Sequence, residues 1–404
     1  MNYTFSNKIA SLKPSAIREI LKAPATADTI SFAAGNPAPE SFPLSEMARL
    51  SASIYETEAA KALQYGVTDG YEPLRSAITA RQIEKGYGTV HSKAEGDGYD
   101  DTAIIVSGGQ QGIELACKIF CNEGDAVICE NPTFIGALNA FRSGGCTPVG
   151  VEMEEDGMVL ADLERVMREN PRAKLLYVIP NFQNPTGKCT SLAKRREIYR
   201  LAQKYDLMIL EDDPYGELRF SGAQIPTLKS LDCDGRVIYC SSFSKILSAG
   251  MRVGFVIAAE AVASKMVVAK QTEDVHTNLF FQTLCYRYMT ECDLDAHISE
   301  IRALYLQKCG LMLEALEKCL PSSVTFTRPE GGLFIWCTLP EGADGAAFVK
   351  AAAARNVRVV PGATFDTDPE ANSRSFRLNY STPSDEQILR GVEILGDLAR
   401  EMGF

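Results

Sequence analysis

The stretch AIIVSGGQQGIELACKIF, from Ala103 to Phe120, decides the fold. A short β-branched run ends at Ser107, and the glycine-rich GGQQG after it opens an amphipathic helical pattern, which together predict one β–α unit. Six more apolar runs follow, separated by helical patterns: AVICE (126–130), TPVGV (147–151), LLYVI (175–179), LMILE (207–211), VIYCS (237–241) and VGFVIA (253–258). This alternation predicts an α/β fold with a mostly parallel, seven-stranded, doubly wound sheet.

The segments on either side of this region have a different texture. Residues 1–40 carry one short helical pattern, PSAIREILK, which is too short to stand alone and is expected to be an arm packed on another unit. After Asp293 a long helical pattern is followed by the strands SVTFT, GLFIWCT and SFRLNYS and a closing helix from Ser384. We therefore predict an arm (1–40) that packs with the small domain, a large domain (41–293) and a small α+β domain (294–404).

Composition excludes several classes of protein. The chain has 404 residues, 46% of them hydrophobic, and a net charge of −11, so it has no sequence-wide basic field for nucleic acid or an anionic membrane. No apolar run is long enough for a membrane span. The twelve cysteines are scattered, without CxxC spacing or a signal peptide, and predict reduced thiols in a cytoplasmic protein. Cys117 and Cys121 are expected to be buried helix residues, and we expect no metal site.

Polar residues that directly follow the strands are the first candidates for a site, because ligands of such sheets bind beyond the carboxyl ends of the strands. The GGQQG at Gly108–Gly112 is a candidate phosphate cradle, because a helix N-terminus offers free N–H groups. It also partly matches a dinucleotide fingerprint, with Glu130 where an acid that binds ribose is expected. A nicotinamide-dependent oxidoreductase is therefore an alternative.

Later strands are followed by groups of other chemistry. Asn184 lies in the stiff loop PNFQNPTGK, and Asp212 and Tyr215 lie in DDPYGEL. Lys245 in SFSK is followed seven residues later by Arg252. A lysine desolvated against an apolar strand can act as a nucleophile. Each feature alone also fits a surface loop, but together they supply what pyridoxal 5′-phosphate requires at one edge of the sheet.

The ordered motifs resemble those of class I/II pyridoxal-phosphate aminotransferases, in the branch of kynurenine and 2-aminoadipate aminotransferases and MocR-like regulators. They are YGxxxGxxxLR (65–75), SGGQQG (107–112), ENPTF (130–134), NPTG (184–187), EDDPY (211–215), SFSKxxxxxxR (242–252), EGGLFIW (330–336) and FRLNYS (376–381). The branch features are IREILK and SFAAGNPAPESFP. The resemblance runs from the arm to the C-terminus, and it implies the aspartate-aminotransferase fold and a homodimer with shared active sites.

The resemblance implies a role for each cofactor-binding residue. Lys245 would hold the cofactor covalently and carry the proton, and Asp212 would pair with the pyridine nitrogen. Tyr215 and Asn184 would bind the phenolic oxygen, while Phe134 would stack on the ring. The phosphate would be bound by Gly109, Gln110, Ser242, Ser244 and Arg252, with Tyr65 reaching in from the partner subunit.

The resemblance also implies a substrate site. Arg377 would bind the α-carboxylate, next to Asn184 and Gly35. Arg18 matches a position that contacts substrate side chains, so a distal carboxylate is a candidate ligand, and a solvated helix arginine is the alternative.

We therefore expect a cytoplasmic, homodimeric aminotransferase that moves an amino group between an α-amino acid and a 2-oxo acid, with 2-oxoglutarate as the expected acceptor. Donors of the 2-aminoadipate, aromatic, kynurenine and branched-chain classes all fit the branch. Two alternatives keep the fold: a pyridoxal-phosphate lyase or decarboxylase, and a non-catalytic MocR-like ligand sensor. The forty residues before the core are too few for the DNA-binding domain of such a regulator, which argues against it.

Overall fold

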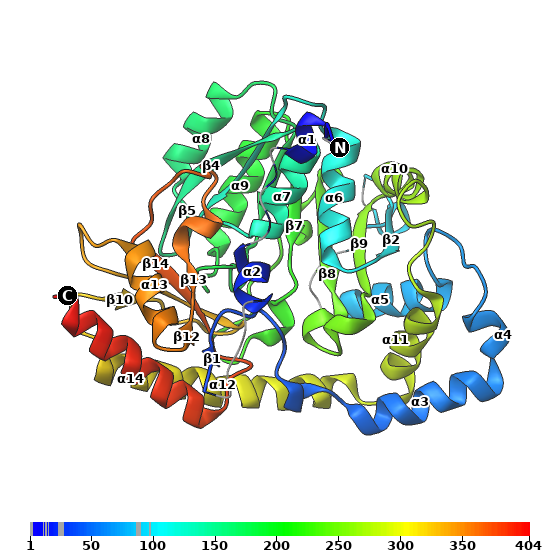
Figure 1. Ribbon diagram of the computed structural model, residues 1–404. Helices are drawn as coiled ribbons and strands as arrows, with labels where there is room; N and C mark the ends of the chain where they lie inside the picture. The colour runs from blue at the N-terminus through cyan, green and yellow to red at the C-terminus, as the bar shows by residue number, and fades with distance from the viewer. Residues whose placement is uncertain are drawn as a thin grey trace.

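The computed structural model describes residues 3–10, 12, 14, 16–22, 28–85, 90–96 and 98–404. Its centre is an eight-stranded sheet in the order β2-β9-β8-β7-β6-β3-β4-β5 (Figure 1). The strands are β2 (Asp101–Val106), β3 (Ala126–Asn131), β4 (Thr147–Glu154), β5 (Gly157–Met158), β6 (Leu175–Val178), β7 (Met208–Asp212), β8 (Val237–Ser242) and β9 (Gly254–Ala259). The run from β4 to β8 is parallel, whereas β9 is antiparallel to both of its neighbours.

The seven predicted strands are all present, and the prediction of a mostly parallel sheet is confirmed. The short strand β5 was not predicted. It is only two residues long and pairs with the end of β4 as a hairpin, so it lacks the apolar run by which a strand is recognised.

Helices cover both faces of the sheet because side chains alternate along each strand. On β6, Leu175 and Tyr177 point into one hydrophobic cluster, with α6 (Gly109–Phe120) and α7 (Ile135–Ser143). Leu176 and Val178 point into the other, with α8 (Leu160–Glu169) and α9 (Leu192–Lys204). Both clusters consist of buried hydrophobic side chains, so close packing holds the sheet on each face and fixes the position of its carboxyl edge.

The C-terminal region builds a second, smaller sheet in the order β10-β11-β14-β13, all antiparallel. Its strands are β10 (Thr325–Phe326), β11 (Phe334–Thr338), β13 (Val360–Pro361) and β14 (Ser375–Asn379). The long helix α12 (Leu294–Cys319) runs along the base of the molecule and packs on α14 (Asp385–Glu401), beside α13 (Gly345–Ala354) (Figure 1). Ser384 caps α14 through a reciprocal pair of hydrogen bonds with Gln387, at the predicted start of the closing helix.

The N-terminal residues lie across both regions. Helix α1 (Asn7–Ala10) contacts α7, and α2 (Ala16–Lys22) contacts β13. Strand β1 (Ile30–Ser31) pairs in parallel with β12 (Val357–Arg358). The arm therefore contacts the C-terminal region, while the division at residues 40 and 293 stays a prediction.

The remaining helices lie near the edge of the large sheet formed by β2 and β9 (Figure 1). They are α3 (Leu44–Thr57), α4 (Ala59–Ala62), α5 (Glu72–Glu84), α10 (Glu260–Gln271) and α11 (Leu279–Glu291). Among the described residues, no helix combines the length and apolarity that a membrane crossing needs.

Candidate active site

A cavity of about 660 Å³ opens at the carboxyl ends of β6, β7 and β8. Thirteen of the fourteen residues that the sequence predicts for the site line it: Arg18, Gly35, Gly109, Gln110, Phe134, Asn184, Asp212, Tyr215, Ser242, Ser244, Lys245, Arg252 and Arg377. They come from the arm, from five loops after large-sheet strands and from the small sheet. The fold thus brings together residues that are up to 359 positions apart in the sequence.

Lys245 follows β8 and ends a short 3-10 helix that begins after Ser242. Its Nζ donates a hydrogen bond to the Gly35 carbonyl at 2.7 Å, so the amine bridges the large sheet and the arm. Burial, together with the positive charges of Arg377 and Arg252, lowers the pKa of Lys245 to about 8. At pH 7 the amine is therefore neutral in about a tenth of molecules, far more than for an ordinary lysine, and a neutral amine is nucleophilic.

Asp212 is the last residue of β7 and is buried. Burial raises its pKa to about 7, although the Tyr177 hydroxyl donates a hydrogen bond to Asp212 Oδ2 at 2.6 Å. Among the residues that the structure describes, no cation lies within hydrogen-bond distance of this carboxylate, and Lys245 acts on it only through space. It is suited to bind a cationic ligand group.

Arg377 on β14 lies deep in the cavity, 1% exposed. Its guanidinium lies between the rings of Phe334 and Phe365, 4.2 and 4.9 Å from their centroids. Nη1 donates to Asn184 Oδ1 at 2.7 Å and Nη2 donates to the Ala33 carbonyl at 2.8 Å, whereas Nε is buried without a hydrogen-bond partner. A buried cation with an unpaired donor is suited to bind an anionic ligand.

Asn184 and Tyr215 link Arg377 to the region around Asp212. Asn184 also lies beside Tyr215 and acts to lower its pKa, and the Tyr215 ring packs edge-on against Phe334, with their centroids 5.9 Å apart. Burial raises the pKa of Tyr215, so its hydroxyl stays protonated and can donate.

The anion-binding groups gather at the N-terminus of α6. The helix begins after Gly108 without a side-chain cap, so the first N–H groups point into the cavity region. The Ser242 hydroxyl donates to Ser244 Oγ at 2.7 Å, and Arg252 Nη2 donates to the Ser107 carbonyl at 3.0 Å. Arg252 has a left-handed backbone (φ 54°), a costly conformation for a non-glycine residue that is concentrated at functional sites.

Tyr65 is the one predicted residue that does not line the cavity. Its side chain is 82% exposed, and its ring packs edge-on against His276 at 5.7 Å between centroids. Nearby Leu63 and Val67 are also largely exposed. Such a group of apolar side chains on the surface is typical of a protein interface.

The structure adds residues that the sequence did not single out. Tyr177 binds Asp212, and Phe334 forms the floor beneath Arg377. The only signal for Tyr177 was a hydroxyl tip within an otherwise apolar strand. Glu130, the candidate ribose-binding acid, is fully buried, and Oε2 accepts hydrogen bonds from the Ile179 N–H and Gln183. It cannot reach a ribose, which removes the basis of the oxidoreductase alternative.

Comparisons with known proteins agree with this geometry. The family described as aminotransferase class I and II matches residues 27–395. The aromatic-amino-acid aminotransferase 1 of Thermococcus litoralis is 38% identical over 401 residues, covering 98% of this chain and 94% of that protein.

Two solved structures have the same fold over nearly the whole length. The kynurenine aminotransferase of Pyrococcus horikoshii, solved in complex with PMP, has a TM-score of 0.93 and 38% identity, covering 99% of this chain and 98% of that one. The α-aminoadipate aminotransferase of Thermus thermophilus, complexed with N-(5′-phosphopyridoxyl)-L-leucine, has a TM-score of 0.87 and 36% identity, covering 98% and 97%.

Proposed function

Since the chain belongs to the class I and II aminotransferases, and is thus a pyridoxal-phosphate-dependent enzyme, we propose that the cavity described above is its active site and that 2-oxoglutarate is its amino acceptor. The observation that carries the proposal is that Lys245, a half-buried lysine with a lowered pKa, lines the same cavity as Asp212 and Arg377.

The residues of the cavity fit the cofactor in charge and in donor type. The uncapped N-terminus of α6, the Ser242 and Ser244 hydroxyls and Arg252 suit a phosphate, and Asp212 suits a protonated ring nitrogen. When bound, the cofactor withdraws electrons from the substrate Cα. Phe134 would stack on its ring, and Asn184 and Tyr215 would bind its phenolic oxygen.

The chain's own residues then have distinct tasks. Lys245 would hold the cofactor covalently and would move a proton at the substrate Cα, which a neutral amine can do without histidine. Asp212 keeps the ring nitrogen protonated, because a nearby carboxylate favours the charged form. Arg377 orients the α-carboxylate through its guanidinium, beside Gly35 and Asn184.

Arg18 and the apolar wall explain how one cavity would accept different side chains. Arg18 lines the cavity from α2, and the same cavity has an apolar wall that includes Ile113 and Ile135. We propose that Arg18 binds the distal carboxylate of 2-oxoglutarate, whereas the apolar wall accepts aromatic or kynurenine-type donors. An Arg18→Ala variant would then raise KM for 2-oxoglutarate and leave KM for an aromatic donor within about twofold.

The exposed side chains around Tyr65 support a homodimer. We propose that Leu63, Tyr65 and Val67 lie against a second copy of the chain and that Tyr65 completes the partner's phosphate site. We also propose a cytoplasmic location, supported by the twelve cysteines, all of which are free.

An absorbance experiment tests the proposed function. The purified holoenzyme should show a cofactor band that changes when a pool of amino acids is added and returns with 2-oxoglutarate. A band that does not change with any donor would contradict transamination at this site. Sodium borohydride should fix the cofactor to a peptide containing Lys245, and a label on another peptide would refute its assignment.

A further inference from the structure

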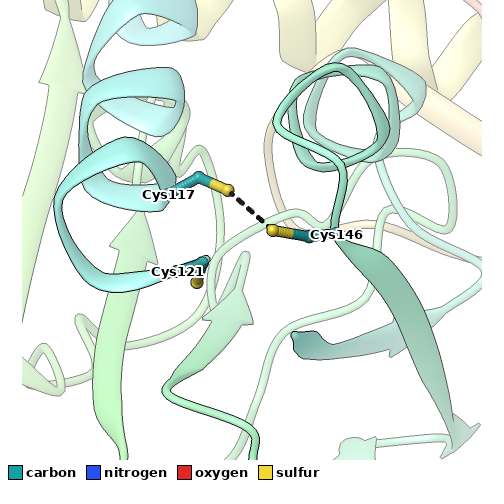
Figure 2. A group of neighbouring side chains, drawn as sticks. All are labelled: Cys117, Cys121 and Cys146. Atoms are coloured by element: carbon teal, nitrogen blue, oxygen red, sulfur yellow. Dashed lines mark hydrogen bonds between the residues drawn. The ribbon is translucent and has the colours of Figure 1, made fainter. Parts of the chain in front are cut away.

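Three cysteines meet at the end of α6 that is remote from the cavity (Figure 2). Cys117 lies in the last turn of the helix, Cys121 is its C-cap, and Cys146 immediately precedes β4. All three Sγ atoms lie within 4.8 Å of one another, and the Cys117 and Cys146 sulfurs are 3.7 Å apart. Two segments separated by 25 residues of sequence thus place three soft ligands at one point.

The spacing of these sulfurs agrees with metal coordination. A tetrahedral centre with metal–sulfur bonds of about 2.3 Å holds its sulfurs about 3.8 Å apart. The Cys117–Cys146 distance matches this value, and the Cys121 sulfur lies within 4.8 Å of both of the others. The sulfurs are not joined as a disulfide, in which they would lie about 2.05 Å apart.

Asp125, the carboxylate close to the three cysteines, already has partners. It accepts hydrogen bonds from the Asn122 N–H and Arg172, at 2.8 and 3.1 Å. The three sulfurs are therefore the ligands that the site offers, and a metal binds them as thiolates.

The group is also accessible. A second cavity, of about 400 Å³, is lined by Cys117 and Cys121 together with Lys8, Asn122 and Glu123. Cys121 is half-buried, whereas Cys117 and Cys146 are buried. An ion can enter from this cavity, where a water molecule would supply a fourth ligand.

We propose that Cys117, Cys121 and Cys146 form a binding site for one thiophilic metal ion, with Zn²⁺ as the physiological candidate. The ion would tie the C-terminal end of α6 to the start of β4. Because the other end of α6 faces the cofactor phosphate, about 18 Å away at 1.5 Å per residue, the ion has a structural role and takes no part in transamination. Each bound thiol releases its proton to solvent, so the affinity rises with pH.

Titration with Cd²⁺ tests the proposal, because cadmium thiolates absorb in the ultraviolet. The reduced, chelator-treated holoenzyme should bind one equivalent of Cd²⁺, develop the thiolate-to-metal band and lose it to excess Zn²⁺. Each of three variants, Cys117→Ala, Cys121→Ser and Cys146→Ala, should weaken metal binding by more than about 100-fold. Loss of a residue that only contacts a metal ligand weakens binding by about 100-fold at most. Transamination at saturating cofactor should stay within about twofold of the wild type.

Cys285→Ala is the matched control, because Cys285 is equally buried on α11 and its pKa is raised by burial alone, without a neighbouring thiol. It should leave the titration unchanged. A second measurement needs no variant: bound Zn²⁺ should protect the three cysteines, and not the exposed Cys233, from alkylation mapped by peptide mass.

Three results would overturn the proposal. They are the absence of a thiolate band, a band that persists in all three variants, and equal alkylation of the three cysteines with and without Zn²⁺. A disulfide between Cys117 and Cys146 in the freshly isolated protein, with no metal bound after its reduction, would also overturn it and replace it with a redox pair.

Discussion

At the scale of single residues, the cavity is dominated by buried charges whose partners are incomplete. Among the described residues, Arg377 keeps one donor unpaired, Asp212 has a tyrosine hydroxyl as its one hydrogen-bond partner, and Lys245 donates to a backbone carbonyl. Burying such groups without full pairing costs stability. The cost is consistent with a site preorganised for a ligand that carries both anionic and cationic groups.

Arg377 should affect both substrates of the reaction, because every amino acid and 2-oxo acid has an α-carboxylate. Loss of a bidentate, charge-assisted contact costs about 3 kcal/mol, or about 100-fold in kcat/KM. Arg377→Ala and Arg377→Lys should therefore raise KM for donor and acceptor alike, the lysine variant less. Steady-state kinetics with both substrates would show this, with the exposed Arg374→Ala as a control. A loss confined to one substrate would contradict the role.

Glu130 should make the stability of the protein depend on pH. Burial raises its pKa to about 8, and its Oε1 has no hydrogen-bond partner. The native state then binds a proton that the unfolded state has lost above about pH 4.5, so stability falls as pH rises from there to about 8. Glu130→Gln should remove this decrease in the free energy of unfolding, which is on the order of a few kcal/mol.

Thermal unfolding of the cofactor-free protein between pH 5 and 9 measures this effect. The difference in Tm between Glu130→Gln and the wild type should grow with pH, and the exposed Glu314→Gln serves as the charge control. A difference that is constant with pH would show that Glu130 is already ionised in the folded protein. Glu211 and Asp212, whose pKa values burial raises to about 7, contribute in the same direction in both proteins.

At the scale of elements, the turn between β2 and α6 controls the phosphate end of the cavity. Gly108 has a φ of 81°, and a Cβ there would lie 2.2 Å from Arg252 Nη2. Gly108→Ala should displace Arg252 and lower the affinity for pyridoxal phosphate by about tenfold or more, as expected for one lost charged contact.

Gly96→Ala is the control that distinguishes steric displacement of Arg252 from the effect of backbone strain. Gly96 also has a positive φ, 96°, but a Cβ there would meet no atom within 4 Å. Fluorescence titration with pyridoxal phosphate should show weaker binding for Gly108→Ala only. Equal losses in both variants would assign the effect to strain.

Sequence patterns predicted these elements well where a run was long and apolar. The strand runs before Asn184, Asp212 and Lys245 each ended within a residue or two of the structural strand, so the order of polar residues after them was sufficient to place the cavity. The contribution of Tyr177 was missed because alternation within a fully buried strand does not show which side chain points to a site. Cys146 was missed because its approach to Cys117 depends on the packing of α6 against α7, the helix that precedes Cys146.

At the scale of the whole molecule, the proposed sharing of active sites between subunits predicts the activity of mixed dimers. If Tyr65 serves the partner's site, a dimer of one Tyr65→Ala subunit and one Lys245→Ala subunit has one wild-type site and one site with both defects. Mixing the two inactive homodimers under exchange conditions should then restore up to about one quarter of the wild-type activity, since half of the dimers are mixed and one of their two sites works.

Activity after subunit exchange, together with mass measurement of the dimers, tests this prediction. A mixture that exchanges but gains no activity would show that Tyr65 acts within its own subunit or not at all. Exchange of Lys245→Ala with itself gives the background. The sequence indicated this arrangement only by resemblance, because exposure of Tyr65 is a property of the folded surface.

The pairing of β1 with β12 also affects the order in which a newly made chain can become functional. The arm emerges from the ribosome first, but strand β1 has no strand to pair with until residue 357 has emerged. The Ala33 carbonyl likewise lacks its hydrogen-bond donor until Arg377 has been synthesised. A nascent chain that has released the large sheet already contains Lys245, Asp212 and Arg252. It would therefore be able to capture the cofactor before it can bind a substrate carboxylate, so ligand capture would precede catalytic competence during synthesis.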